Sequence, residues 1–247
     1  MAYTTTLVPG IRFDHIALAL PRMADAMGFV VGTLGGAPAF GMDAGAYRFG
    51  QWKFANRARL ELLEPLGSDG FLHRFLATRG RGIHHVTFKV PSLAEACARA
   101  EARGHEIVGR NERNPYWKEA FLHPRQALGI VIQLAETAPF EGPHRPWSDA
   151  PPMPASPPRP VSVLGLRMRA RSRERAIDQW RGILDAGVAD LAGTPVFTWA
   201  GSPMRIAVEI DPGAEEGPLD IELASDRPVS LPAGPHPVLG ARFSLSG

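Results

Sequence analysis

The most constraining feature of the chain is an internal repeat with a period of about 70 residues. In each copy a strand-like segment with a central histidine is followed, 46 or 48 residues later, by a strand-like segment with a central Glu or Gln. The two pairs are His15 with Glu61 and His85 with Gln133. Imidazoles and side-chain oxygens are donors that divalent metal ions take up. Because internal repeats outrank local propensity as a fold signal, we read the chain as repeated modules.

Alternation along the strand-like segments predicts where these donors point. In the segment after His85, Val86, Phe88 and Val90 share the apolar face that must pack on helices, so His85 points to the opposite face. Its neighbour His84 is expected to point away from that face. The same reasoning places His15, Glu61 and Gln133 on the non-helix side of their strands. All four side chains are therefore candidates for one site.

Each of the first two modules is predicted to run strand, helix, then several strands. The first helix is expected from about 21 to 31, with a proline suited to its first turn. The second begins with a capping box, in which Ser92 is the cap and Glu95 follows three residues later, and it ends at Gly104. On its apolar face Cys97 is expected to be a buried small side chain, not a catalytic one.

A proline-rich segment divides the chain into residues 1–137, a linker at 138–160 and residues 161–247. The linker contains nine prolines, at 139, 143, 146, 151, 152, 154, 157, 158 and 160, which rules out helix or central strand and favours an extended, semi-rigid connection. Residues 161–247 read as one further, degenerate βαβββ module. Gly165 stands there at the position of His15, and Glu222 at that of Glu61. The tail at 239–245 resembles the opening strand of a fourth module, and we expect that it could complete the sheet of a second copy. We expect this part to be structural or to form a dimer contact.

Composition excludes several function classes. A net charge of +2 with scattered basic residues argues against a nucleic-acid partner. No apolar run approaches the length of a membrane span, and the first residues lack the pattern of a signal peptide. We therefore expect no membrane partner and a cytoplasmic location, in keeping with the single cysteine.

The motifs DHIALAL, LELLEPLG, GIHHVTFKV, EAFLHPR and GIVIQLAE resemble the vicinal oxygen chelate (glyoxalase/bleomycin resistance/dioxygenase) superfamily, and most closely its methylmalonyl-CoA epimerase and glyoxalase branch. The likeness covers nearly all of residues 11–136. It implies an α+β fold in which two βαβββ modules form an eight-stranded cup, here followed by a partial third module. It also implies one divalent metal ion (Zn, Co, Ni, Mn or Fe) on His15, Glu61, His85 and Gln133.

One position departs from the family pattern. The epimerases and glyoxalases commonly carry a glutamate where this chain has Gln133, and a carboxamide cannot accept a proton at neutral pH. Gln133 therefore either ligates through its oxygen or only lines the site, and a catalytic base must lie elsewhere. Glu61 is the first candidate. Asp43 is the second, since it lies roughly where epimerases carry an additional catalytic glutamate, although an aspartate that caps its own turn explains it as well.

The resemblance implies a metal-dependent lyase or isomerase that transfers a proton next to a metal-bound carbonyl or enediolate. Its substrate would be a small molecule. Arg79 and Arg81 could bind the negative charge of an anionic substrate or of a CoA thioester. Two alternatives stay open. Two histidines with Glu61 also form the ligand set of non-haem Fe(II) dioxygenases, and other members of the superfamily bind small molecules without metal. An odd number of modules favours a homodimer over packing of the third module on its own chain.

Overall fold

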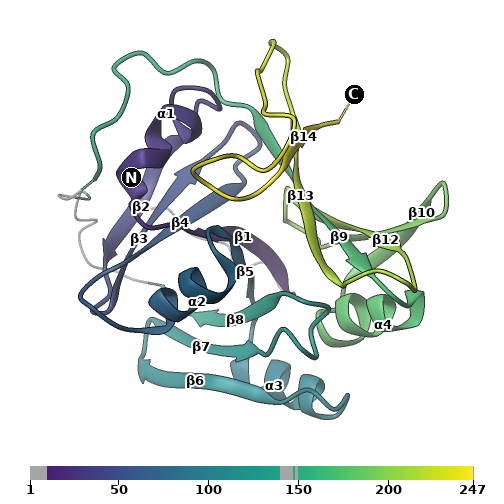
Figure 1. The fold of residues 1–247 in the computed structure, drawn as a ribbon. Coiled ribbons are helices and arrows are strands. Elements are labelled where there is room, and N and C mark those ends of the chain that lie inside the picture. Colours follow the sequence, from purple (N-terminus) through teal and green to yellow (C-terminus); the bar gives the residue numbers. More distant parts are fainter. Residues whose placement is uncertain (1–9, 140–146, 148–149, 247) are drawn as a thin grey trace. The chain divides into compact units, whose positions relative to one another are not determined.

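The structure is a computed structural model that describes residues 10–139, 147 and 150–246 (Figure 1). Part of the predicted linker, at 140–146 and 148–149, lies outside these residues. The first two modules contain β1 (Arg12–Ala19), η1 (Met23–Ala26), α1 (Met27–Val30), β2 (Ala37–Asp43), β3 (Tyr47–Lys53), β4 (Arg59–Pro65), α2 (Phe71–Arg79), β5 (Gly82–Lys89), α3 (Leu93–Glu101), β6 (Ile107–Asn114), β7 (Trp117–Leu122) and β8 (Val131–Thr137).

These eight strands form one hydrogen-bonded sheet in the order β2-β3-β4-β1-β5-β8-β7-β6. Within the first module β1 and β4 are parallel, with Ala17 opposite Glu61, and β3 runs antiparallel to β4. In the second module β7 likewise runs antiparallel to both β6 and β8. The α+β class and the paired βαβββ modules that the repeat predicted are confirmed.

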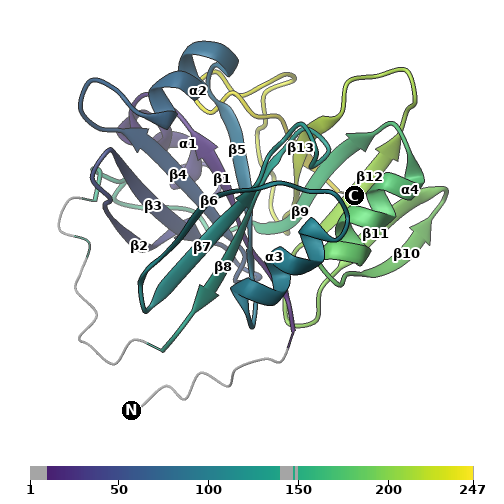
Figure 2. The same cartoon turned by 90° about the horizontal axis from the view of Figure 1, so that it is seen from below.

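The helices agree with the sequence only in part. Ser92 caps α3 by accepting a hydrogen bond from the Glu95 backbone N–H, and Cys97 is buried, as expected. Figure 2 shows α3 alongside β6, β7 and β8, which it contacts. The first helix is shorter than the predicted 21–31 span, since only η1 and α1 form there. Gly28 and the β-branched residues Val30 and Val31 are poor helix formers and disfavour a longer helix here.

Helix α2 was not anticipated, and it packs on the side of the sheet to which the donors were predicted to point. Its buried Leu72 clusters with Ala17, Ala19 and Leu63, which alternate along β1 and β4 with the same phase as His15 and Glu61. The segment carries Phe71, Leu72, Phe75 and Leu76 among polar residues. This spacing is helical in hindsight, but it is too short to be decisive in the sequence.

The rest of the chain forms a second sheet. Its elements are β9 (Ser162–Ala170), α4 (Arg173–Ile177), η2 (Asp178–Ile183), β10 (Gly187–Leu191), β11 (Thr194–Thr198), β12 (Arg205–Ile210), β13 (Gly217–Ala224) and β14 (Phe243–Leu245). The strand order is β10-β11-β12-β9-β13-β14. The third βαβββ module therefore ends at β12, and β13 with β14 forms the remnant of a fourth.

This order corrects two predictions. The strand that holds the position of β4, next to the opening strand, is β12 and not β13. Glu222 of β13 therefore does not stand at the position of Glu61. The tail strand β14 does not open a further module either, because it pairs in parallel with β13, with Ser244 opposite Glu222. The sequence of a single strand does not reveal which strand it pairs with. The prediction therefore gave β13 the place in the sheet that β12 occupies.

Backbone contacts divide the chain into two compact units. Unit 1 contains residues 1–14, 86–144 and 169–217, and unit 2 contains residues 15–85, 145–168 and 218–247. Each unit thus draws residues from before and after the linker. Among the described residues, no helix is long and apolar enough to cross a membrane.

Within unit 2 the described part of the linker has neither helix nor strand before β9 and packs on the first module. The Trp147 ring lies against Trp52, with ring centroids 5.5 Å apart, and over Gly41 and Gly50, where a Cβ atom would overlap it. Further along, the Val161 N–H donates to the Leu34 carbonyl. The Trp147 ring can therefore pack on β2 and β3 because Gly41 and Gly50 have no side chains.

Candidate metal centre

Three of the predicted donors meet in unit 2. His15 comes from β1, Glu61 from β4 and His85 from β5, and their side chains are buried, with 1%, 6% and 5% of the residue surface exposed. One ligand atom from each lies within 4.8 Å of the other two. The period-2 reasoning on these strands correctly placed the three side chains on one face.

The distances suit a shared divalent ion. His15 Nε2 lies 3.4 Å from Glu61 Oε1, and His85 Nε2 lies 3.8 Å from the same oxygen. Two donors that bind one ion at about 2.1 Å are separated by roughly 3.0 to 3.4 Å, so only a small contraction is needed. A buried carboxylate also requires a positive or hydrogen-bonding partner. Two imidazoles and one carboxylate are therefore a chemically suitable donor set for a zinc-like or iron-like ion.

Gln51 orients the carboxylate. This residue of β3 lies directly opposite Glu61 in the strand register, and its Nε2 donates to Glu61 Oε2 at 2.8 Å. The hydrogen bond leaves Oε1 facing the two histidines, as outer partners of metal ligands do. Sequence reasoning missed Gln51, because only the pairing of β3 with β4 places it on the same face of the sheet as Glu61.

His84 was predicted to point away from His85, but the structure brings the two rings together. Their Nδ1 atoms lie 2.8 Å apart, and the His84 ring also packs against Phe75 of α2, with centroids 4.7 Å apart. The unforeseen helix α2 covers this strand end and explains the difference. Burial lowers the pKa of His84 to about 4, opposed weakly by the charge of Glu61. A neutral His84 can accept a hydrogen bond from the His85 Nδ1–H group, and in that tautomer His85 Nε2 is the deprotonated nitrogen that can ligate a metal ion.

Gln133 lies in unit 1, buried with 7% of its surface exposed. Its Oε1 accepts a hydrogen bond from Thr87 Oγ1 at 2.6 Å, and its Nε2 donates to Glu119 Oε2 at 2.7 Å. Trp117 Nε1 donates to the same carboxylate oxygen of Glu119. These contacts fix the amide orientation, while its part in a ligand set stays a prediction. Glu119 was not identified from the sequence.

Asp43 occupies the last position of β2 and is exposed. Its carboxylate forms a bidentate pair with Arg48 of β3, from Nε at 2.6 Å and Nη2 at 3.2 Å. The hydrogen bonds from Arg48 lower the pKa of Asp43. The structure therefore gives this aspartate a cross-strand ion pair, which makes it a weaker base.

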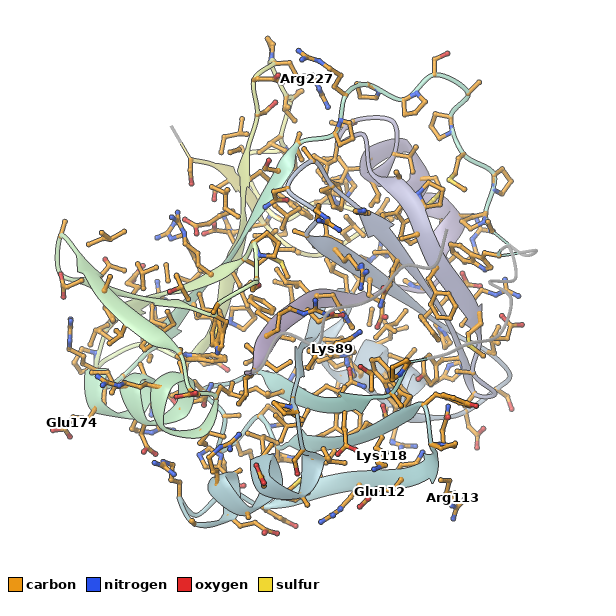
Figure 3. All side chains as sticks on the ribbon, turned by 180° about the vertical axis from the view of Figure 1, so that it is seen from behind. Lys89, Glu112, Arg113, Lys118, Glu174 and Arg227 are labelled. Atoms are coloured by element: carbon orange, nitrogen blue, oxygen red, sulfur yellow. The ribbon has the colours of Figure 1, made fainter. Side chains whose placement is uncertain are left out.

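Two cationic side chains close to the repeat motifs form contacts with other residues of the chain. In unit 2 Arg81 Nη1 donates to the Pro237 carbonyl. In unit 1 the Lys89 ammonium, labelled in Figure 3, lies 3.7 Å from Asp14 Oδ1 and 5.8 Å from the centre of the Trp117 ring. Lys89 has the same position in the alternation of β5 as His85 and Thr87, so the three residues share one face of the strand. Sequence reasoning did not consider Lys89 as an anion-binding group.

A polar cluster joins three strands of the second sheet. Asp220 of β13 forms an ion pair with Arg167 of β9 at 3.1 Å and accepts a hydrogen bond from Ser244 of β14. No histidine lies on any of these three strands.

Comparison with known proteins places the likeness in the first two modules. Residues 14–121 match the model of the Glyoxalase/Bleomycin resistance protein/Dioxygenase superfamily. The uncharacterized protein YqjC of Bacillus subtilis is 31% identical over 128 residues, which are 51% of this chain and 91% of that protein. The mitochondrial methylmalonyl-CoA epimerase of Bos taurus is 27% identical over 135 residues, covering 51% of this chain and 74% of the epimerase.

A solved structure covers more of the chain. A mutant of 4-hydroxymandelate synthase from Streptomyces coelicolor superimposes with a TM-score of 0.59 over 89% of this chain and 72% of the synthase. The two sequences are only 14% identical, so this likeness concerns the fold alone. It extends the family architecture to the second sheet, which the sequence matches do not reach.

Proposed function

Since the chain belongs to the glyoxalase/bleomycin resistance protein/dioxygenase superfamily, we propose that it is a metal-dependent lyase or isomerase that transfers a proton at the carbon next to a carbonyl or enediolate. The observation that carries the proposal is the buried cluster of His15, Glu61 and His85. Its donors come from three strands of one sheet, and two imidazoles with one carboxylate form a donor set that a divalent ion takes up.

His15 Nε2, His85 Nε2 and Glu61 Oε1 would hold one divalent ion (Zn, Co, Ni, Mn or Fe), and ligation by Gln133 stays a prediction from the sequence. When bound, such an ion supplies Lewis acidity toward a carbonyl or enediolate oxygen. Gln51 keeps Glu61 turned toward the imidazoles, and His84 sets the tautomer of His85. The ligand set is thus supported by partners from the same unit.

Glu61 is the proposed base. Its carboxylate would take the proton from the carbon beside the substrate carbonyl and return it, on the same or the other side, so that no proton is gained or lost overall. Asp43 remains the second candidate, but its pair with Arg48 stabilises the unprotonated form. The substrate would be a small anionic molecule or a CoA thioester. Relatives named methylmalonyl-CoA epimerase support the latter. A cytoplasmic location stays a prediction from the sequence.

A second candidate follows from the same three ligands. Two histidines and one carboxylate are the set used by non-haem Fe(II) oxygenases, which leave the other positions of the ion open. In this alternative Glu61 acts only as a ligand, and Gln133 is not needed. A metal-free binding protein is the third alternative.

Metal analysis of protein purified without chelator separates the three alternatives. Stoichiometric zinc, cobalt or nickel supports the first proposal, iron supports the oxygenase, and the absence of metal supports the binding protein. His85→Ala should lose the ion, whereas His105→Ala, on the segment before β6, is the matched control.

The proton transfer is tested by deuterium uptake at the carbon next to the thioester of methylmalonyl-CoA in D₂O. Glu61→Gln should lower the rate by about 10²- to 10⁴-fold while retaining metal. Full exchange by a metal-loaded Glu61→Gln protein would exclude Glu61 as the base.

A further inference from the structure

In unit 2 three exposed apolar side chains lie on β2 and α2. Among the described residues seven large apolar side chains are exposed, and three of them, Phe40 (43%), Met42 (49%) and Phe71 (39%), belong to β2 and α2 of this unit. Scattered exposed apolar residues are normal, but contiguous ones mark binding surfaces.

Strand register places the β2 side chains of this group on the side of the metal cluster. Gln51, which bonds Glu61, lies opposite Phe40 on β2, and the next pair on the same face joins Met42 to Phe49. Phe49 in turn lies opposite Leu63 of β4, two residues beyond Glu61. Since side chains two residues apart point to the same face, these apolar groups begin about 7 Å from the ligand carboxylate.

Ring contacts run without interruption from this surface to a metal ligand. Tyr47 packs against Phe71 with centroids 5.2 Å apart, and Phe71 packs against His84 at 5.5 Å. The His84 ring lies 5.1 Å from that of His85. On the strand side, Phe40 and Phe49 are 5.6 Å apart. The exposed rings and the candidate metal centre are therefore continuous.

The apolar cluster under α2 does not include Phe40, Met42 or Phe71. Leu72 anchors the helix, since it is only 1% exposed among Ala17, Ala19 and Leu63, and Tyr47 and Phe49 pack against the same cluster. Phe71 precedes it and remains 39% exposed. Phe40 and Met42 likewise project from a strand that is already paired with β3. Their exposure therefore has a cost that packing within the chain does not offset.

We propose that Phe40, Met42, Tyr47, Phe49 and Phe71, called the aromatic rim below, bind an apolar group of the substrate. This inference rests on the proposed function, because the oxygens of the same substrate would meet the His15–Glu61–His85 cluster. The substrate class is accordingly a carbonyl or enediolate compound that carries an aromatic or branched apolar group about two to four bonds from its oxygens. Two to four bonds reach roughly 3 to 5 Å, and the apolar group itself covers the rest of the roughly 7 Å between Glu61 and the rim.

The test compares two chelators that differ only in the apolar group. Acetohydroxamate and 3-phenylpropionohydroxamate offer the same pair of oxygens to a metal, and both are titrated into the full chain loaded with Co²⁺, with visible absorption and calorimetry as readouts. The phenyl compound should bind at least about tenfold tighter, because a buried ring adds apolar contact. Phe71→Ala and Phe40→Ala should reduce this ratio to about two without changing the affinity for acetohydroxamate.

The control is Tyr116→Ala, which removes a similarly exposed aromatic ring (48%) from unit 1 and should leave the ratio unchanged. A ratio near one in the wild type, or a ratio that neither rim variant alters, overturns the inference. If light scattering shows that the rim variants convert a dimer to a monomer while the ratio stays the same, the rim is a contact between copies and the inference is also wrong.

Failure of the proposed function gives a different result. A protein that takes up no Co²⁺ contradicts the metal-dependent function. The same two compounds are then titrated into chelator-treated protein, in which the rim alone should still favour the phenyl compound in a manner that depends on Phe71. If the chelator-treated protein shows no such preference, the inference about the aromatic rim is wrong as well.

Discussion

Each of the first two modules pairs a carboxylate with a carboxamide on neighbouring strands, but in opposite order. In unit 2 Gln51 of β3 donates to Glu61 of β4, and in unit 1 Gln133 of β8 donates to Glu119 of β7. The carboxylate that the repeat leads one to expect at position 133 therefore stands on the adjacent strand. A hydrogen bond to a charged acceptor is worth more than a neutral one, so both pairs should be maintained by selection on stability as well as function.

The reversed order makes Gln133→Glu a revealing substitution. The new carboxylate would face Glu119 Oε2, which accepts from Gln133 at 2.7 Å, and two buried carboxylates at this distance cannot both ionise. We expect a loss of about 2 kcal/mol in the free energy of unfolding. The double variant Gln133→Glu/Glu119→Gln should recover most of it, since the hydrogen bond is restored with exchanged partners.

Urea denaturation of the wild type, both single variants and the double variant measures the coupling. If the two residues do not interact, the effects of the single variants add, and the pair has no structural role. The double variant should also bind a divalent ion at least as tightly as the wild type, because a carboxylate replaces a carboxamide at the predicted ligand position.

Some residues of the site could be predicted from the sequence and others could not, because their positions depend on different features of the fold. His15, Glu61 and His85 depend only on strand alternation, which is visible in the sequence as apolar residues on every second position. Gln51 and Glu119 depend on how two strands are paired, and His84 depends on α2. Register and helix packing are long-range properties, so a local pattern does not reveal them.

At the scale of elements, the segment between β13 and β14 is organised by one histidine. His236 Nδ1 accepts the backbone N–H groups of Val238 and Leu239, at 3.2 Å and 3.3 Å. Its ring packs on Phe29, which also contacts Phe243 of β14. Burial lowers the pKa of His236 below its ordinary value of 6.5. The neutral ring is therefore the form that fits the fold.

This arrangement predicts a pH dependence of stability. Below about pH 6.5 the unfolded chain binds a proton at His236 more readily than the folded chain, so the free energy of unfolding should fall as pH decreases from 7.5 to 5. Protonation of Nδ1 would also remove the acceptor for two backbone groups. His236→Gln should flatten this part of the profile, measured by denaturant unfolding at several pH values. An unchanged slope in the variant would assign the dependence to other groups.

The seat of Trp147 on β2 and β3 gives a second prediction at this scale. Gly50→Ala should displace the Trp147 ring and lower the free energy of unfolding by about 1 to 3 kcal/mol, because a Cβ atom and the ring cannot occupy the same space. In a Trp147→Ala background the same glycine change should be nearly neutral. Unfolding monitored by tryptophan fluorescence gives both values. Additive effects would show that the linker tryptophan does not rest on Gly50 in solution.

Strand and helix assignments from the sequence succeeded where period-2 and capping signals were strong, as in β1, β5 and α3. They failed for β10 and β11, which are short, and for the exchange of β12 and β13. In β10 all five residues are exposed, so it lacks the apolar alternation by which a strand is recognised. Strand order depends on which chain segments meet in space, and a degenerate module has lost the ligand residues that would have marked its register.

At the scale of the whole molecule, the predicted division at 137 and 160 describes the order of the chain rather than its compact parts. Unit 2 is held together by contacts from both sides of the linker: Asn56 Nδ2 donates to the Val163 carbonyl, and Arg227 Nη2 donates to the Thr33 carbonyl. Arg227, labelled in Figure 3, also donates to the Arg159 carbonyl. Residues beyond 160 therefore stabilise the unit that carries the His15–Glu61–His85 cluster.

The homodimer predicted from an odd number of modules needs a different basis. The tail strand that was expected to complete a partner's sheet is already paired, since Ile221 of β13 lies opposite Phe243 of β14. The edge strands of the two sheets are β2, β6, β10 and β14. Of these, β10 is the candidate because it exposes Val188 (37%) and Leu191 (54%), and an edge strand with exposed apolar side chains is a template for pairing with a second copy.

We therefore expect the dimer to form through β10 edges related by twofold symmetry, which places the same surface of both copies in contact. Light scattering at micromolar concentration should give twice the chain mass of 26.7 kDa. Val188→Lys with Leu191→Lys should shift the mass to that of one chain, because lysine on an edge strand disfavours pairing, whereas Leu245→Lys, at the 44% exposed end of β14, should not. A wild-type protein that elutes and scatters as a single chain at all concentrations would contradict the dimer and leave β10 as an exposed edge protected only by its short length.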